Sequence, residues 1–166
     1  MKPIEDIAAP FQMMEPDMRL ELLLEYTEKL PPLPERYAEM RDAGMAMVHE
    51  CQSPVFLMPE VEQNGDTAGE KTVHVHADVP ESAPTARAFT AILHEAFDGA
   101  TPAQVRQAPD DLLDRLGLSG LLGMQRTQGL AAIYRRLRNE VARQSTAGES
   151  TAGQETARSS DGTAEA

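Results

Sequence analysis

The hydrophobic pattern of the first forty residues predicts two helical segments separated by prolines. Residues 1–15 are interpreted as a loose lead-in. Apolar positions at helical spacing predict a helix from about residue 16 to residue 30, with one buried stripe: Leu20, Leu23, Leu24, Thr27 and Leu30. The prolines of segment 31–34 end this helix, because proline cannot continue the backbone hydrogen-bond ladder. A short helical turn is expected over residues 35–43.

The middle of the chain has the period-two alternation of β-strands. It predicts strands over residues 45–48, 55–61 and 72–78, and in the last of these Val73, Val75 and Ala77 share one face. Turn residues separate the segments, at 50–53 and at Asn64-Gly65-Asp66. Three consecutive strands joined by turns predict an antiparallel meander.

The second half returns to helical spacing. A helix capped by Ser82 has the apolar stripe Phe89, Ile92, Leu93, Ala96 and Phe97. Shorter helices are expected after Thr101 and Pro109, and a last helix begins near Thr127 with the stripe Leu130, Ile133, Tyr134, Leu137 and Val141. The predicted class is therefore α+β, a small three-stranded antiparallel sheet covered by helices.

The final segment, residues 145–166, differs from the rest in composition. It contains no Leu, Ile, Val, Phe, Met or Tyr and repeats the sequence Ser-Thr-Ala-Gly. A segment that buries so little cannot offset its ordering entropy. The prediction is one domain over residues 1–144 followed by a disordered low-complexity tail over residues 145–166.

Charge and composition narrow the class of partner. The net charge is −12, although residues 126–143 hold five arginines and a single acid, Glu140. An acidic body argues against nucleic acid as a partner, since that binding depends on a basic surface. No run approaches the roughly 20 apolar residues that span a membrane, and no signal-peptide pattern is visible. One cysteine permits no internal disulfide, so a reduced, cytosolic protein is expected.

That single cysteine, Cys51, is the main candidate for chemistry. A structural cysteine usually lies within an apolar run, whereas Cys51 is surrounded by polar residues just before a strand. A nucleophilic thiol needs a cation or a helix N-terminus nearby. His49 would point to the same side if the backbone is extended, and Arg126, just before the last helix, is the second candidate. These two residues are predicted to support Cys51.

A metal site is an alternative use of the same region. His74 and His76 share one strand face, and together with His49 and Cys51 they would make four ligands. No compact spacing such as CxxC or HExxH supports this hypothesis. The simpler interpretation is that the two strand histidines face solvent.

Four motifs occur in order along the chain: Leu30-Pro31-Pro32-Leu33-Pro34, Cys51-Gln52-Ser53-Pro54-Val55-Phe56-Leu57, Asp98-Gly99-Ala100-Thr101-Pro102 and Arg126-Thr127-Gln128-Gly129-Leu130. With these motifs the chain resembles the SufE family, the cysteine desulfuration proteins of the SUF iron–sulfur assembly system. The resemblance extends from about Phe11 to Arg143. The related IscU-type scaffolds share the broad architecture but need three cysteines, and this chain has one.

The resemblance implies a function as well as a fold. A partner cysteine desulfurase would form a persulfide on its own cysteine, and the thiolate of Cys51 would take over the terminal sulfur. The resulting persulfide would pass to the SUF scaffold complex for iron–sulfur cluster assembly. The chain would stimulate the desulfurase in this accessory transpersulfuration role and would need no cofactor, since the pyridoxal phosphate belongs to the partner. Whether the chain forms a homodimer is left open.

Three departures from the family pattern bear on this expectation. Glu50 stands where the family usually has glycine, and its carboxylate is expected to oppose thiolate formation. Pro54 is expected to restrain the cysteine loop, and the usual acidic pair is represented by Asp78 and Glu81. Glu50 motivates an alternative, a non-catalytic module of the same fold that binds and regulates a desulfurase without carrying sulfur.

Overall fold

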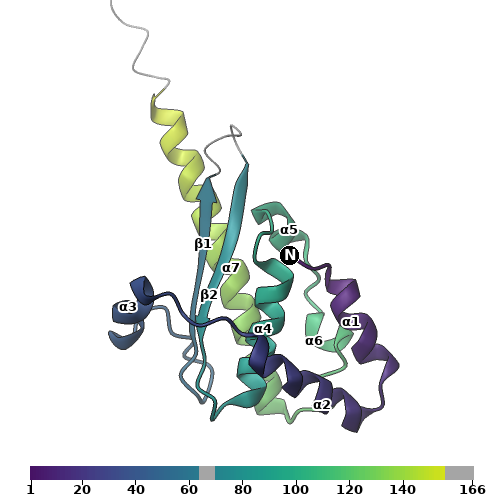
Figure 1. Cartoon of the computed structure of the whole chain (residues 1–166). Helices are drawn as coiled ribbons and strands as arrows, with labels where there is room; N and C mark the ends of the chain where they lie inside the picture. Colours follow the sequence, from purple (N-terminus) through teal and green to yellow (C-terminus); the bar gives the residue numbers. More distant parts are fainter. Residues whose placement is uncertain (64–69, 156–166) are drawn as a thin grey trace, which may run out of the picture.

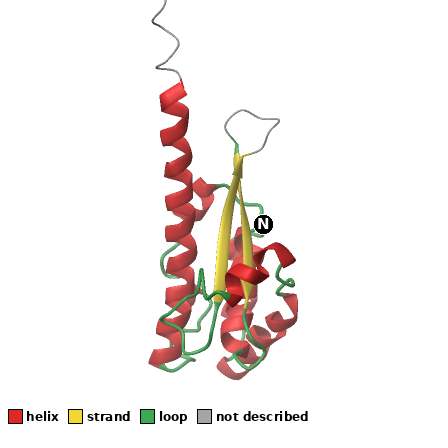
Figure 2. Ribbon diagram, turned by 90° about the vertical axis from the view of Figure 1, so that its left-hand side faces the viewer, coloured by secondary structure: helices red, strands yellow, loops and turns green. Residues whose placement is uncertain are grey.

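A long C-terminal helix and a narrow two-stranded sheet form the centre of the fold in the computed structural model, which describes residues 1–63 and 70–155. The helix, α7 (Met124–Glu155), runs beside strands β1 (Phe56–Gln63) and β2 (Lys71–Asp78), as Figures 1 and 2 show. Helix α4 (Pro84–Phe97) packs against β2, and the N-terminal helices α1 (Ile4–Met13) and α2 (Pro16–Glu25) lie on the outer side of α4. The α+β class is confirmed.

The N-terminal residues are helical, so their interpretation as a loose lead-in is wrong. Ile4, Ile7 and Phe11 follow helical spacing and are buried on one face of α1, despite Pro10 inside the helix. Helix α2 ends five residues earlier than predicted and continues as the 3-10 turn η1 (Tyr26–Lys29). Of the predicted stripe, Leu23 and Leu30 are buried, whereas Leu24 is 37% exposed.

The sheet has two strands among the described residues rather than the predicted three. Residues 45–48 contribute only one bridge, between Met47 and Phe56. The chain turns sharply just before it, because Gly44 and Ala46 adopt positive φ angles of 72° and 55°. A left-handed residue breaks the regular extension of a strand. The alternation of Met45 to Val48 therefore reflects a turn with one pairing step.

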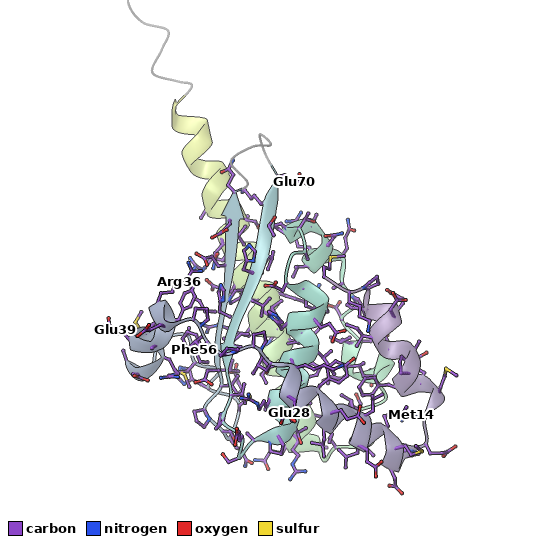
Figure 3. The ribbon with its side chains drawn as sticks, viewed as in Figure 1. Met14, Glu28, Arg36, Glu39, Phe56 and Glu70 are labelled. Atoms are coloured by element: carbon purple, nitrogen blue, oxygen red, sulfur yellow. The ribbon has the colours of Figure 1, made fainter. Side chains whose placement is uncertain are left out.

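The hairpin of β1 and β2 is antiparallel, with Leu57 opposite Ala77 and Val61 opposite Val73 on the core face. The turn predicted at Asn64-Gly65-Asp66 lies outside the described residues. The opposite face is mixed, with Phe56 beside polar residues such as Glu60 and His76, and is partly covered by η2 (Glu35–Tyr37) and α3 (Ala38–Asp42). Figure 3 shows Arg36 of this segment beside β1, where it pairs with Glu60 at 2.9 Å.

Each outer edge of the hairpin is paired by a segment that is not a strand. On β2, the Asp98 carboxylate accepts a hydrogen bond from Val75 N at 2.9 Å, and Gly99 N donates to Val73 O at 2.8 Å. On β1, the Gln144 side chain accepts from Val61 N at 2.9 Å and donates to Pro59 O at 2.8 Å. Unpaired edges leave backbone groups unsatisfied and isolated hairpins are marginal, so these contacts support a sheet of only two strands.

The remaining helices are present as predicted, but their starts differ. The N-cap of α4 is Ala83 rather than the predicted Ser82, and α7 begins at Met124, three residues before Thr127. The stripes predicted for α4 and α7 are buried in full, and Thr101 forms the expected capping box with Gln104 at the start of α5 (Pro102–Gln107). A short helix α6 (Leu112–Arg115) leads towards α7. None of the helices in the described part of the chain is long and apolar enough to cross a membrane.

The predicted tail begins as a continuation of α7. This helix passes residue 144 without a break and continues to Glu155, and Ser145 is buried. Residues 156–166 lie outside the described residues, so disorder there stays a prediction.

Candidate functional site

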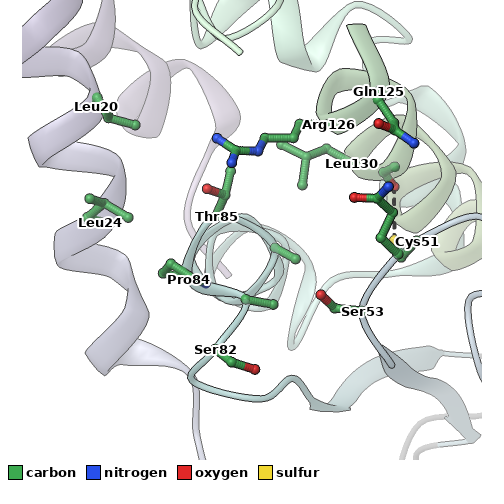
Figure 4. Close-up of a pocket in the computed structure, with 14 residues that line it drawn as sticks. Leu20, Leu24, Cys51, Ser53, Ser82, Pro84, Thr85, Gln125, Arg126 and Leu130 are labelled. Carbon is green, nitrogen blue, oxygen red and sulfur yellow. Dashed lines mark hydrogen bonds between the residues drawn. The ribbon is translucent and has the colours of Figure 1, made fainter. Parts of the chain in front are cut away.

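Cys51 lies in the loop that connects Met47 to β1, where it packs against the first turns of α7. The loop over residues 49–53 consists of turns and bends, and the Cys51 side chain is half-buried. Its Sγ donates a hydrogen bond to the Gly129 carbonyl at 3.4 Å, the dashed line of Figure 4. A Cβ at Gly129 would stand 3.6 Å from this sulfur. That distance admits one methyl group in ordinary contact, whereas a larger side chain at this position would meet the cysteine loop.

The resting thiol is held in its protonated form. Burial raises the pKa of Cys51, and the neighbouring Glu50 carboxylate raises this pKa further. The hydrogen bond to the Gly129 carbonyl acts in the same direction, because only the protonated thiol can donate it. The expectation that Glu50 opposes thiolate formation agrees with this pKa direction.

Cys51 opens into a pocket of about 380 Å³ between α2, the start of α4 and the start of α7. The walls are mixed: Leu20 and Leu24 of α2, Pro84 of α4 and Leu130 of α7 supply apolar surface, and polar side chains line the rest. This pocket explains why Leu20 and Leu24 are not in the core, although they follow the helical stripe. A partner group of modest size can therefore reach the thiol without unfolding the domain.

Arg126 lines the same pocket, so the structure brings two of the three predicted site residues together. It is the single charged side chain among the described residues of the lining. Figure 4 shows its guanidinium near Thr85, on the far side of the pocket from Cys51. Arg126 therefore makes no contact with the resting thiol, and its supporting role stays a prediction for the bound state.

His49 does not share the pocket of Cys51. The prediction required an extended backbone, and the chain turns at residues 49–53 instead. The His49 side chain is exposed and lines a separate depression together with Arg135 and Arg136. His49 is therefore not positioned to act on the resting thiol.

Comparisons with known proteins place this geometry in a family. The model of the SufE family, described as an Fe-S metabolism associated domain, matches residues 5–141. The chain belongs to the SufE family. Two uncharacterized SufE-like proteins of Mycobacterium tuberculosis, from strains CDC 1551 and H37Rv, are each 32% identical over 139 residues, covering 84% of this chain and 91% of theirs.

A solved structure shares the same fold. The solution structure of a hypothetical protein from Thermus thermophilus superposes with a TM-score of 0.70 at 31% identity. The match covers 88% of this chain and 99% of that protein. The fold of this SufE-family chain thus has a counterpart among solved structures.

Two of the four SufE-like motifs come together in the fold, and the other two lie elsewhere in the domain. The Leu-Pro-Pro-Leu-Pro segment connects η1 to η2, and the segment from Asp98 to Pro102 pairs with the edge of β2 before opening α5. The cysteine motif and the motif from Arg126 to Leu130 meet at the pocket. Of the departures, Asp78 pairs with Arg41 at 2.7 Å, while Glu81 is exposed.

The metal hypothesis finds no support in the geometry of this SufE domain. Within residues 1–63 and 70–155 no group of three or more His, Cys, Asp or Glu side chains could hold an ion. His74 lies near Glu62 and Asp98, and His76 faces Glu60 and the ring of Tyr37. The side chain of Cys51 is directed instead towards Gly129 of α7.

Sequence reasoning missed two residues of α7 that contact the cysteine loop. Gly129 was recognised only as a motif residue, and its role as the floor beneath Cys51 follows from a contact 78 residues apart in the chain. Arg135 lies 3.7 Å from the Glu50 carboxylate and thereby connects α7 to the residue before the cysteine. The only sequence signal for Arg135 was the cluster of arginines between residues 126 and 143.

Proposed function

We propose that this SufE-family domain accepts sulfur from a cysteine desulfurase onto Cys51, stimulates that enzyme and passes the sulfur on for iron–sulfur cluster assembly. The observation that supports this most directly is the placement of the chain's one thiol. Cys51 is half-buried, hydrogen-bonded to α7 and open to a pocket that a partner segment can enter. Family membership supplies the link to iron–sulfur metabolism.

The transfer step conserves atoms and electrons without an added oxidant. The thiolate of Cys51 attacks the outer sulfur of the partner's cysteine persulfide. The S–S bond of that persulfide breaks, and the partner's cysteine leaves as a thiolate. A new S–S bond forms on Cys51, and the proton lost by its thiol is available to the leaving thiolate. The pyridoxal phosphate remains in the desulfurase throughout.

The residues of this chain have distinct tasks in that step. Gly129 and the burial of the loop keep the thiol protonated at rest, which limits reaction with other electrophiles. A partner segment that fills the pocket displaces water from the space into which Cys51 opens, and Leu20, Leu24 and Leu130 offer this segment apolar contact. Arg126 supplies a positive charge that stabilises the Cys51 thiolate or anchors a carboxylate of the partner.

Intact mass spectrometry without reductant tests the proposal. The chain is incubated with an active cysteine desulfurase and L-cysteine, and a gain of one sulfur atom mapped to Cys51 is expected. Cys51→Ser should fold normally, show no mass gain and fail to stimulate the desulfurase. Full stimulation by Cys51→Ser would reject sulfur acceptance as the mechanism.

The raised pKa of Cys51 favours one alternative, a module that regulates the desulfurase without carrying sulfur. In that case alkylation of Cys51 would leave the stimulation of the desulfurase unchanged. The same mass experiment separates the two functions, because a regulatory module binds the active desulfurase and gains no sulfur.

A further inference from the structure

The exposed side of α7 beyond the cysteine loop carries a cluster of basic and amide side chains. We call it the arginine face and define it as Arg135, Arg136, Asn139 and Arg143. These residues line a depression of about 420 Å³, across from His49 and Glu50 of the cysteine loop. Residues 135, 139 and 143 follow at intervals of four, so they lie on one side of the helix.

The charge of this face contrasts with the rest of the molecule. The depression holds three arginines against two glutamates, Glu50 and Glu140, on a chain whose net charge is −12. A negative body with one basic region orients a partner whose own surface is acidic. The same negative body repels nucleic acid, so a protein surface is the better complement.

The donors of the arginine face are only partly satisfied within the chain. Arg135 is 62% exposed and has one loose contact, at 3.7 Å, with Glu50. Arg143 is 67% exposed and pairs with Glu140 on its own helix. Arg136 Nε is buried and has no hydrogen-bond partner among the described residues. A buried donor without a partner is costly, so the Arg136 side chain would gain from a rearrangement on docking that brings this nitrogen to an acceptor.

We propose that the arginine face docks an acidic surface of the cysteine desulfurase, whose carboxylates bind Arg135, Arg136 and Arg143 and displace Glu50 from Arg135. This inference rests on the proposed function. Arg135 and Arg143 are eight residues apart, which places them about 12 Å from each other along the helix axis. The partner surface therefore carries at least two carboxylates at about that spacing.

Two partners could bind the arginine face, the desulfurase that donates sulfur or the protein that receives it. The contact between Glu50 and Arg135 favours the desulfurase. Accepting sulfur requires Cys51 as a thiolate, whereas in the donating step the recipient's nucleophile attacks. Partner carboxylates on Arg135 compete with Glu50 and repel it, which moves a negative charge away from the thiol. A docking surface coupled to Glu50 therefore serves the accepting step, in which the desulfurase is bound.

The test compares two double variants with the same change in charge. Arg135→Gln/Arg143→Gln removes two positive charges from the arginine face. The control, Arg36→Gln/Arg115→Gln, removes two exposed arginines whose ion pairs, with Glu60 and Asp111, lie on other elements. Binding to the desulfurase and stimulation of its turnover are titrated at low and high salt, and sulfur on Cys51 is measured by mass at saturation.

For the face variant we expect the dissociation constant and the half-maximal concentration to rise roughly three- to tenfold, with a weaker dependence on salt. The control should match wild type, and at saturation both variants should gain the same sulfur on Cys51. If the face variant binds the desulfurase as tightly as wild type does, the proposal is overturned. The same holds if this variant is impaired only in passing sulfur on to the recipient protein.

The result is separable from the fate of the proposed function. If wild type binds the desulfurase but gains no sulfur, sulfur acceptance fails, while weaker binding of the face variant still supports the docking surface. If wild type gains sulfur and the face variant binds equally well, sulfur acceptance stands and the docking surface fails. Thermal unfolding of both double variants verifies that each is folded.

Discussion

The thiol of Cys51 donates a hydrogen bond to the carbonyl of Gly129, 78 residues further along the chain, at a distance of 3.4 Å. The contact limits the size of the side chain at residue 129, because a Cβ there would stand 3.6 Å from Sγ and 4.0 Å from the Cys51 Cα. These are ordinary van der Waals distances for one added methyl group, but they leave no room for a larger group. Gly129 thus determines how closely the cysteine loop packs on α7.

Substitutions at Gly129 should separate helix stability from exposure of the thiol. Gly129→Ala should stabilise the domain by about 0.5–1 kcal/mol, since glycine is unfavourable within a helix, and leave alkylation of Cys51 almost unchanged. Gly129→Leu should displace the loop and increase the alkylation rate at neutral pH. Gln128→Leu, at the adjacent exposed position, is the control and should have the wild-type rate. Equal rates for both leucine variants would contradict this role of Gly129.

Neutralising Glu50 should make Cys51 more reactive at neutral pH. Burial and the Glu50 carboxylate both raise the pKa of the thiol, so Glu50→Gln removes the second cause and leaves the first. The thiolate then appears at lower pH, and alkylation at neutral to slightly alkaline pH should accelerate roughly two- to fivefold. The rates of variant and wild type should converge at high pH, where both thiols are ionised. Glu28 is an exposed acid on η1, so Glu28→Gln should leave the pH dependence of Cys51 alkylation unaltered.

Most of the elements could be predicted because their patterns are local. The stripes of α4 and α7 were predicted correctly since each consists of apolar residues at helical spacing, and β2 alternates clearly. The third strand was wrong because residues 45–48 alternate but include a left-handed residue, Ala46, which spacing does not reveal. The prediction of a loose lead-in was wrong because proline is unusual inside a helix and Pro10 lies within α1. The apolar face of this helix, Ile4, Ile7 and Phe11, was present in the sequence.

The site could be predicted only in part for a similar reason. Cys51 was identified from its uniqueness and polar surroundings, and Arg126 as a cation just before the last helix, and both line one pocket. His49 was misplaced because the direction of a side chain in a turn depends on backbone angles that residue types do not fix. The partners of Cys51 and Glu50 on α7, Gly129 and Arg135, are brought together by tertiary folding alone.

Arg126 should contribute to function without contributing to stability. Its side chain is exposed and has no hydrogen bond or ion pair within the described part of the chain, so Arg126→Gln should alter the unfolding free energy by less than about 0.5 kcal/mol. Desulfurase stimulation should fall roughly three- to tenfold, because the pocket loses its one positive charge. Arg115→Gln on α6 is the matched control. Wild-type stimulation by Arg126→Gln would remove this residue from the mechanism.

Gln144 should be important for stability although it lies at the edge of the predicted tail. Its amide pairs with both Val61 N and Pro59 O, in the manner of a neighbouring strand. Gln144→Ala leaves these part-buried backbone groups without partners and should cost about 1–3 kcal/mol in unfolding free energy. Gln128→Ala, on the exposed side of the same helix, should have almost no effect in the same denaturant titration. If Gln144→Ala and wild type unfold at the same denaturant concentration, water replaces the Gln144 amide on the β1 edge.

The hydrogen bond from Tyr37 to Glu60 should make part of the stability depend on pH. The Tyr37 hydroxyl donates to Glu60 Oε2 at 2.6 Å, and this bond is the largest cause of the lowered pKa of the Glu60 carboxyl. A lowered carboxyl pKa contributes stability that is present above the unfolded value of 4.5 and is lost as the pH falls through the lower folded value. Tyr37→Phe should therefore cost about 1–2 kcal/mol at neutral pH, a range reduced for the partial exposure of Glu60.

The pH profile distinguishes this charged hydrogen bond from a neutral one elsewhere in the chain. The difference between Tyr37→Phe and wild type should narrow as Glu60 becomes protonated in the folded state, while the phenylalanine ring keeps the contact with His76. Tyr134→Phe is the control, because the Tyr134 hydroxyl donates to the Pro109 carbonyl at 2.8 Å, and burial raises the pKa of Tyr134 to about 12. The cost of Tyr134→Phe in unfolding free energy should be the same at neutral pH and at the acidic pH where Glu60 becomes protonated. Neither the Tyr134 hydroxyl nor the Pro109 carbonyl titrates between these two pH values. A constant cost for Tyr37→Phe as well would mean that its acceptor is not an ionised Glu60.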